Sequence, residues 1–422
     1  MENGTQEINV CLQPEYVGKF QCDGAICNSK CCKGWMVDID GPTYQAYCMI
    51  EPKAERKKIV SQIKFNKKQN KFYISMGKNG ACPFLQHDGL CKIQKTFGAE
   101  CLSNTCTIYP RMSYTAGDFL LRALTLACPV AAKLALLPET PMVFEEVSIT
   151  AEQWAEIVRR SAGRLPRMEA VLLNVQYGAI SILQNRELTI DQRLIVLGFF
   201  LDQAGDMVEA GEQERIETLS MVYTADDFME KVPEMLRAIS FRPAEYVKSI
   251  FGLMKAMYGK DSQFSGREGF LMGHVIRAFG MENKEVTLSG MVETYQTSFR
   301  PVEERLLRKY GHIFENYIVN EFFIGHYPQA IVGTFVHNFS LFVMTYKLVE
   351  FMAVVLSMTE GDEMDAGRIV ELIGHMTSTL DHDTEFLRSF AQDTMKRQKN
   401  VVECMKNLLN AGDEFSAKLM RK

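Results

Sequence analysis

The sequence Cys22-x4-Cys27-x3-Cys31-Cys32-Lys33-Gly34-Trp35 opens the segment that decides the fold of this chain, and Cys128-Pro129 closes it. A second group of motifs lies between them: Cys82-Pro83-Phe84-Leu85, Cys91, Cys101, Cys106 and Tyr109-Pro110-Arg111. Of the 12 cysteines in the chain, 11 lie at or before position 128. Thiols gathered in this way are expected to form disulfide bonds or to bind a metal, and this choice determines the type of domain that the segment forms.

The residues around the cysteines favour metal coordination over disulfide bonds. The N-terminal sequence Met1-Glu2-Asn3-Gly4-Thr5-Gln6-Glu7 lacks the basic and then apolar regions of a signal peptide. We therefore expect the protein to stay in the reducing cytoplasm, where structural disulfides rarely persist. Cys31 and Cys32 are also adjacent, which suits a disulfide poorly.

The spacing of the cysteines does not by itself identify the metal. Zinc and iron–sulfur clusters both accept four thiolates. Structural zinc sites usually carry two C-x2-C pairs, and this chain has none. The Cys-Pro steps at Cys82 and Cys128 are typical of the end of the bacterial ferredoxin motif. The pattern favours iron–sulfur, with zinc and metal-free reduced thiols as the alternatives.

Length and composition limit the class of protein. A chain of 422 residues with 47% hydrophobic residues can form two domains with a core in each. The net charge of −5 offers no basic footprint, so we expect no nucleic-acid partner. No stretch reaches the roughly 18 uninterrupted apolar residues of a transmembrane helix. Residues 331–358 come nearest, but polar residues such as Lys347 and Glu350 interrupt them, so we predict a buried helix.

The cysteine-rich part is predicted to be a small α+β domain. Residues 35–40 alternate apolar and polar as in a half-buried strand, and residues 71–76 form a second short strand. The basic run from Lys53 to Lys71 is interpreted as a solvated helix and hairpin, the alternative being a docking surface for an acidic protein. Pro129 begins a helix that stops before Pro138. Cys128 therefore lies at the N-cap, where free N–H groups and the helix dipole favour a thiolate.

Beyond a predicted linker at residues 138–149, helical signals dominate. Thr150 to Gln153 form a capping box before a helix, and residues 193–201 are predicted to form a core helix. Another helix carries an apolar stripe made of Leu306, Tyr310, Ile313, Phe314, Tyr317 and Phe322. Residues 383–408 are predicted to form a last amphipathic helix. The fold class is therefore mainly α, with a small cysteine-rich α+β metal-binding domain over residues 1–137 and an all-helical domain over residues 150–422.

Taken in order, the motifs resemble those of the flagellin lysine-N-methylase family. They are Phe20-Gln21-Cys22, Cys27, Cys31-Cys32-Lys33-Gly34-Trp35, Cys82-Pro83-Phe84-Leu85, Gly89-Leu90-Cys91, Leu102-Ser103-Asn104-Thr105-Cys106, Tyr109-Pro110-Arg111 and Cys128-Pro129-Val130-Ala131-Ala132. In the helical part the resemblance continues over residues 314–323, so it covers most of the chain. The cysteine core also resembles small iron- or zinc-chelating domains.

The resemblance implies a bacterial cytoplasmic enzyme, associated with membranes, that methylates surface lysines of flagellin before export. Its methyl donor would be S-adenosylmethionine, and its activity would need a [4Fe-4S] cluster. The cysteines that match the family pattern, and would bind the metal, are Cys22, Cys27, Cys31, Cys32, Cys82, Cys91, Cys106 and Cys128. Outside the pattern are Cys11, Cys48, Cys101 and Cys404, which we interpret as ordinary buried cysteines. The sequence departs from the family at Val130, where an acidic residue would follow Cys-Pro.

The donor and lysine sites carry no clear motif. Without a G-x-G-x-x-G after a strand, a Rossmann-type methyltransferase domain is not expected. Trp35, Tyr109 and Arg111 adjoin the cysteines and are candidates for contacting the donor. The simpler alternative is that Trp35 fills the core and that Arg111 forms an ion pair with an acidic residue. Tyr317 and Asn320 lie one helical turn apart and are the candidates for catalysis, although a packed helix with one buried polar contact is the simpler explanation.

Several alternatives stay open at the level of sequence. The Cys-x3-Cys-x2-Cys signature of radical enzymes is absent because Gly34 stands at its third cysteine, so we favour a structural or redox-supporting cluster. Eight thiols suffice for two four-cysteine sites or for one cluster with spare cysteines. A second hypothesis for function is a non-enzymatic iron- or zinc-binding sensor or adaptor with a helical partner-binding domain. A monomer and a homo-oligomer are both compatible with the sequence.

Overall fold

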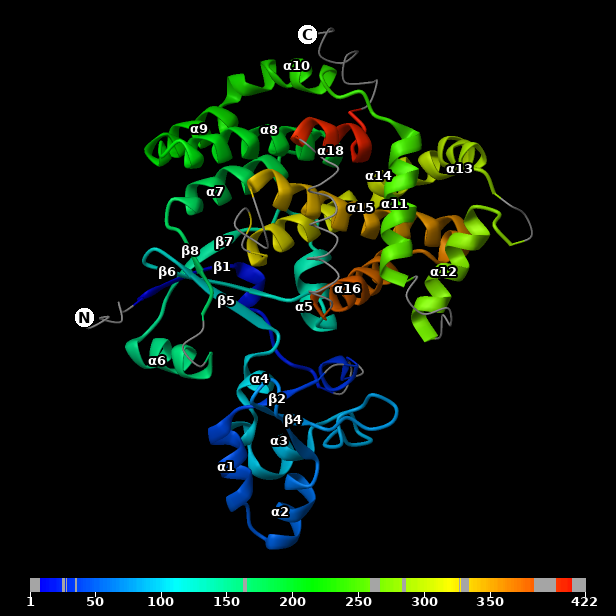
Figure 1. Ribbon diagram of the computed structural model, residues 1–422. Coiled ribbons are helices and arrows are strands. Elements are labelled where there is room, and N and C mark those ends of the chain that lie inside the picture. The colour runs from blue at the N-terminus through cyan, green and yellow to red at the C-terminus, as the bar shows by residue number, and fades with distance from the viewer. Residues whose placement is uncertain are drawn as a thin grey trace. The chain divides into compact units, whose positions relative to one another are not determined.

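The computed structural model describes residues 8–24, 27, 29–34, 36–161, 165–258, 266–282, 286–325, 327, 334–382 and 400–411. The chain divides into two units, whose elements are labelled in Figure 1. Unit 1 comprises Met1–Leu134 and Val143–Arg167, and unit 2 comprises Ala135–Met142 and Met168–Lys422. The chain therefore leaves unit 1 once, returns to it, and then remains in unit 2.

A five-stranded sheet of order β7-β1-β6-β5-β8 forms one part of unit 1. Its strands are β1 (Val10–Pro14), β5 (Arg111–Ala116), β6 (Phe119–Leu124), β7 (Phe144–Ser148) and β8 (Arg167–Met168). Strand β1 pairs with β6 in parallel and with β7 antiparallel, while β5 and β6 form a hairpin. The sheet thus joins segments from both ends of unit 1.

The predicted linker at residues 138–149 is wrong in its second half, because β7 is a strand of this sheet. The Glu145 carboxylate accepts a hydrogen bond from Gln13 Nε2 at 2.9 Å, and Val147 packs on a buried cluster that includes Trp154. The acidic residues of β7 obscure the sequence pattern of a strand. Its pairing partner β1 also lies far away in the sequence, so the local sequence does not reveal the pairing. The helix that follows, α6 (Ala151–Arg160), has the predicted capping box of Thr150 and Gln153 and belongs to unit 1.

A three-stranded sheet of order β2-β4-β3 forms the other part of unit 1. It comprises β2 (Asp38–Ile39), β3 (Ile63–Asn66) and β4 (Lys71–Ile74), and the helices around it are α1 (Gly41–Met49), α2 (Lys53–Val60), α3 (Lys92–Phe97) and α4 (Asn104–Ile108). Asp40 accepts hydrogen bonds from the backbone N–H groups of Thr43 and Asn104, which ties α1 to α4. The predicted strands near residues 38 and 71 and the basic helix and hairpin are confirmed.

In the described residues, unit 2 is helical apart from its contribution to β8. Its helices are α7 (Leu172–Leu183), α8 (Ile190–Glu209), α9 (Ile216–Thr224), α10 (Val232–Arg237), α11 (Pro243–Tyr258), α12 (Gly266–Ala278), α13 (Leu288–Thr294), α14 (Arg300–Ile324), α15 (Phe335–Glu360), α16 (Ala366–His382) and α18 (Val401–Leu408). The predicted fold class is confirmed. Of the predicted last helix, α18 is described, and residues 383–399 lie outside the described part.

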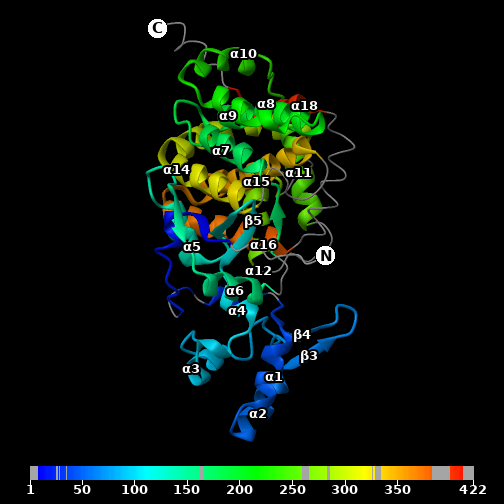
Figure 2. The ribbon, with the colours of Figure 1, turned by 90° about the vertical axis from the view of Figure 1, so that its left-hand side faces the viewer.

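Helix α15 is the central helix of unit 2. It contacts α8, α11, α12, α14, α16 and α18, and Figure 2 shows it between α7 and α16. By length and composition alone it could cross a membrane, but 94% of its most apolar window is buried in the protein. The prediction of a buried helix in this segment is therefore confirmed.

Close packing of α8 against its neighbours leads to a first prediction. A Cβ atom at Gly198 would overlap Met405 Cε and lie 2.9 Å from the ring of Phe339. We expect Gly198→Ala to lower the free energy of unfolding by about 1–3 kcal/mol because the core must shift to admit the methyl group. Urea unfolding followed by circular dichroism measures this change.

The matched control is Gly252→Ala in α11. No described atom would lie within 4 Å of a Cβ at Gly252, so the substitution only improves helix propensity. We expect it to raise the free energy of unfolding by about 0.5–1 kcal/mol. Changes of the same sign in both variants would contradict the packing argument.

Candidate functional site

The thiols of the second cysteine group lie together in unit 1. Burial, together with the neighbouring thiols of Cys91 and Cys106, raises the pKa of Cys82 to about 11. The N–H groups of Phe84 and Leu85 donate to the Cys82 sulfur and partly offset this shift. Burial likewise raises the pKa of Cys106 to about 11, against a hydrogen bond from the Ser103 hydroxyl.

The first cysteine group adjoins the second. The Sγ atoms of Cys31 and Cys32 are 3.9 Å apart. A hydrogen bond from the Cys32 thiol lowers the pKa of Cys31 to about 7 and raises the pKa of Cys32. Cys82 and Cys91 also raise the pKa of Cys32, so Cys32 links the two groups.

Cys128 has the environment that its position before Pro129 predicts. Helix α5 (Pro129–Leu136) begins directly after it, and the N–H groups of Ala131 and Val130 donate to its sulfur. Burial still raises its pKa to about 11, and Cys27 and Cys31 add to this shift. The helix N-terminus therefore presents Cys128 to the first cysteine group.

Electrostatic interactions divide these thiols into two sets that also influence each other. One set is Cys32, Cys82, Cys91 and Cys106, and the other is Cys27, Cys31 and Cys128. Cys22 lies apart from both, near Arg111, whose pKa it raises. In the described residues, no group of three or more His, Cys, Asp or Glu side chains is arranged so that it could hold a metal ion. The structure thus brings seven predicted ligands into one neighbourhood, and their binding of a metal stays a prediction.

The four cysteines outside the pattern have different environments. Cys11 and Cys404 are buried, as predicted. Cys101 is half-buried. The prediction is wrong for Cys48, which is exposed because it lies on the solvent face of α1 while its neighbour Tyr47 faces the core.

The three candidates for donor binding lie in different environments. Trp35 lies outside the described residues. Tyr109 is half-buried between α4 and β5, where a cis peptide bond joins it to Pro110. Arg111 begins β5, and its guanidinium carbon lies 5.3 Å from the centroid of the Phe20 ring. Among the described residues no acid forms an ion pair with Arg111, and its role in donor binding stays a prediction.

The candidates for catalysis lie within α14 of unit 2. Tyr317 is 2% exposed and Asn320 is fully buried, and neither is without an interaction partner. In the same motif, Asn316 Nδ2 donates to the Pro138 carbonyl at 2.9 Å. The motif at residues 314–323 is therefore a largely buried helical segment that mixes apolar and polar side chains, and a catalytic role for Tyr317 and Asn320 stays a prediction.

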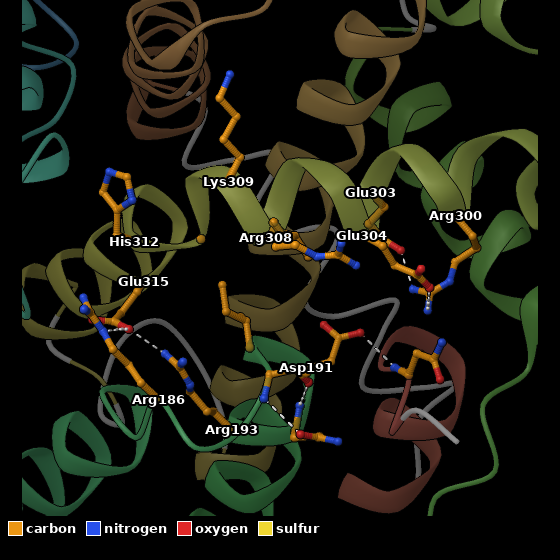
Figure 3. Close-up of a pocket in the computed structure, with 16 residues that line it drawn as sticks. Arg186, Asp191, Arg193, Arg300, Glu303, Glu304, Arg308, Lys309, His312 and Glu315 are labelled. Carbon is orange, nitrogen blue, oxygen red and sulfur yellow. Dashed lines mark hydrogen bonds and ion pairs between the residues drawn. The ribbon is translucent and has the colours of Figure 1, made fainter. Parts of the chain in front are cut away.

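Unit 2 contains a cavity of about 700 Å³ between α8 and α14 (Figure 3). At one end, Glu315 accepts hydrogen bonds from Arg186 at 2.8 Å and from Arg193 at 2.7 Å. At the other end, Arg300 pairs with Glu303 and, at 3.2 Å, with Glu304. Most of the charges in the wall are thus neutralised by the protein itself. Sequence analysis missed this arrangement because its partners are far apart along the chain.

A buried ionic network lies behind this cavity. Lys347 is 2% exposed, and its Nζ atom lies 3.0 Å from Asp191, 3.7 Å from Glu303 and in close contact with Glu350. Burial raises the pKa of Glu350 to about 7, although Lys347 opposes the shift. Asp191 and Glu303 also line the cavity, so the network holds two of its wall carboxylates in place.

Comparison with known proteins assigns the helical region. Residues 177–410 match the family model of the FliB lysine N-methylase C-terminal domain. This chain belongs to the FliB lysine N-methylase family. The matched region of this FliB-family protein contains the cavity of unit 2, the Lys347 network and the 314–323 motif. The cysteines that would bind a metal lie outside it, in unit 1.

Three relatives extend the match beyond that region. The lysine-N-methylases of Salmonella choleraesuis (strain SC-B67) and Salmonella typhimurium (strain LT2) are each 23% identical to this chain, over 91% of it and 95% of each relative. The flagellar biosynthetic protein FliU of Salmonella muenchen is 34% identical over 149 residues, which are 34% of this chain and 88% of FliU. No solved structure matches the chain. The resemblance to the FliB family is confirmed.

Proposed function

We propose that this protein transfers methyl groups from S-adenosylmethionine to lysine side chains of flagellin, and that its cysteines hold a [4Fe-4S] cluster which this activity needs. The observation that carries the proposal is the similarity to lysine-N-methylases over 91% of the chain. Family membership makes the protein a lysine N-methylase of flagellar biosynthesis, so the non-enzymatic sensor or adaptor hypothesis is set aside.

In this proposal, four thiols of unit 1 are the ligands of the cluster. Cys32, Cys82, Cys91 and Cys106 would hold it, since their thiols already influence one another. Backbone N–H groups at Cys82 and Cys128 donate to sulfur, which stabilises the thiolate form that a metal binds. A bound cluster would supply a rigid cross-link between the cysteine loops and one-electron chemistry. Zinc is the alternative metal, because four thiolates suit it as well.

The transfer itself is a polar substitution in this proposal. The target ammonium group has a reference pKa of about 10.4 and must first lose a proton to a base. The neutral nitrogen then forms a bond to the donor methyl carbon while the carbon–sulfur bond breaks. The bonding electron pair passes to sulfur, which leaves as S-adenosylhomocysteine. The task of the protein is to align the two groups and to exclude water.

The same proposal includes the location of the enzyme in the cell. The family resemblance implies that flagellin is modified before export, and the proposed reaction is therefore cytoplasmic. The family resemblance adds peripheral association with membranes. Fractionation of lysed cells should detect the enzyme in the soluble cytoplasmic fraction and in the membrane fraction. Recovery of the enzyme only from the periplasm or the culture medium would contradict this location.

A transfer assay with the anaerobically purified full chain tests the function. Flagellin, methyl-labelled S-adenosylmethionine and the enzyme are incubated together, and labelled lysines are located by mass spectrometry. We expect label on flagellin lysines and none on flagellin whose lysines were acetylated beforehand. Iron and zinc are measured on the same sample. An active protein that carries zinc and no iron would overturn the cluster, and absence of transfer would overturn the function.

A further inference from the structure

Unit 1 has a cavity of its own, of about 540 Å³, on the five-stranded sheet. Its wall includes Arg111 and Arg122 from the β5–β6 hairpin and Glu152 from the first turn of α6. This volume is in the usual range of small-molecule sites, about 300–1,000 Å³. Every residue that lines it belongs to unit 1.

The strand register places both arginines on one face of the sheet. Ser113 pairs with Arg122, and Arg111 lies two residues before Ser113 on the same strand. Side chains two residues apart, and those directly opposite across a strand pair, point to the same face. Arg111 and Arg122 are therefore diagonal neighbours, and Arg122 Nε donates to Ser113 Oγ at 3.3 Å.

The charge of this arginine pair is not neutralised by the protein. Neither Arg111 nor Arg122 has a carboxylate partner among the described residues, and the Phe20 ring supports the Arg111 guanidinium. Burial lowers the pKa of Arg111, and the positive charge of Arg122 lowers it further. Two half-buried guanidinium groups held together in this way attract an anion, and a carboxylate fits their planar donors.

A free negative charge lies in the same cavity. The Glu152 carboxylate has no basic partner in the described part of the chain, and a hydrogen bond with the Thr150 side chain lowers its pKa. Glu156, by contrast, is paired with Arg159 and Arg160. The cavity therefore offers two free cations and one free anion, a pattern that complements a zwitterion.

We propose that this cavity binds the α-amino-acid end of the methyl donor, with Arg111 and Arg122 on its carboxylate and Glu152 on its ammonium group. The assignment rests on the proposed function, which supplies the donor. It places the donor in the same unit as the cysteines. The cavity of unit 2 is less suited to this role because its buried Arg193 is already neutralised by Glu315.

Binding measurements with three ligands test this proposal on the full-length protein. S-adenosylmethionine and S-adenosylhomocysteine both carry the amino-acid end, whereas 5′-methylthioadenosine lacks it. We expect Arg122→Gln and Arg111→Gln to raise the Kd of the first two ligands about tenfold or more. The Kd of 5′-methylthioadenosine should stay unchanged, which also shows that the variants are folded.

The control variant is Arg56→Gln, which removes an arginine of α2 outside the cavity and should leave all three affinities unchanged. Unchanged affinity for S-adenosylmethionine in both cavity variants would overturn the assignment while leaving the proposed function intact. A raised KM for flagellin with an unchanged KM for the donor would also overturn it, since the arginines would then bind an acidic residue of the substrate. A wild-type protein that binds no donor would refute the proposed function itself.

Discussion

The Cys82→Ser variant is expected to be purified without iron and to have lost methyl transfer by more than about 100-fold. Cys82 is buried beside Cys91 and Cys106, and backbone N–H groups already point at its sulfur. A serine oxygen is a harder and much less acidic ligand, so it does not replace a thiolate on iron. Iron and acid-labile sulfide contents, the visible absorption spectrum and label transfer to flagellin measure the effect.

The matched control for this experiment is Cys48→Ser. Cys48 is exposed on α1 and lies outside the family pattern, so its replacement should leave iron content and activity unchanged. Wild-type iron in the Cys82→Ser variant would remove Cys82 from the ligand set. Equal loss of iron in both variants would mean that the metal is held without a defined cysteine site.

The second large effect is expected from Lys347→Met in the core of unit 2. The methionine fills a similar volume but leaves Asp191, Glu303 and Glu350 without the ammonium group that neutralises them. Breaking a buried ion pair by removing one partner costs about 3–5 kcal/mol, because the remaining charge stays buried and uncompensated. We expect the free energy of unfolding at pH 8 to fall by this amount, as measured by urea unfolding.

The loss should depend on pH in a definite direction. Burial raises the pKa of Glu350 from an ordinary 4.5 to about 7, so between these values the folded state binds more protons than the unfolded state. The contribution of Glu350 to stability is therefore present below pH 4.5 and is lost as the pH rises through 7. Lys347 holds this pKa down, so its removal raises the pKa further and extends the loss to higher pH. The variant should lose more stability at pH 8 than at pH 6.

Lys248→Met is the control for the network. Lys248 is exposed and, in the described part of the chain, its ion-pair partner is Glu245 on the surface of α11. Surface pairs of this kind contribute about 0–1 kcal/mol, so little change is expected at either pH. A Lys347→Met variant as stable as the control, or one whose loss is the same at both pH values, would contradict the network.

The sequence by itself determined the features whose signals are local. Cys128 before Pro129 marked a thiol at a helix N-terminus, because a proline suits only the first turn of a helix. The Thr150 capping box marked the start of α6 for a similar reason. The apolar length around residues 335–358, interrupted by charges, was enough to predict a buried helix. The ordered cysteine motifs identified the family.

Only the tertiary structure decided which distant residues meet. Strand β7 and helix α6 belong to unit 1 because β7 pairs with β1, and nothing in the local composition of residues 143–148 encodes that partner. Arg111 and Arg122 became neighbours through the register of the β5–β6 hairpin, and Lys347 met Asp191 across 156 positions of sequence. Such contacts depend on how helices and strands pack together, which residue type and spacing do not specify. The cavities, and the charges that face them, therefore emerge only when the chain is folded.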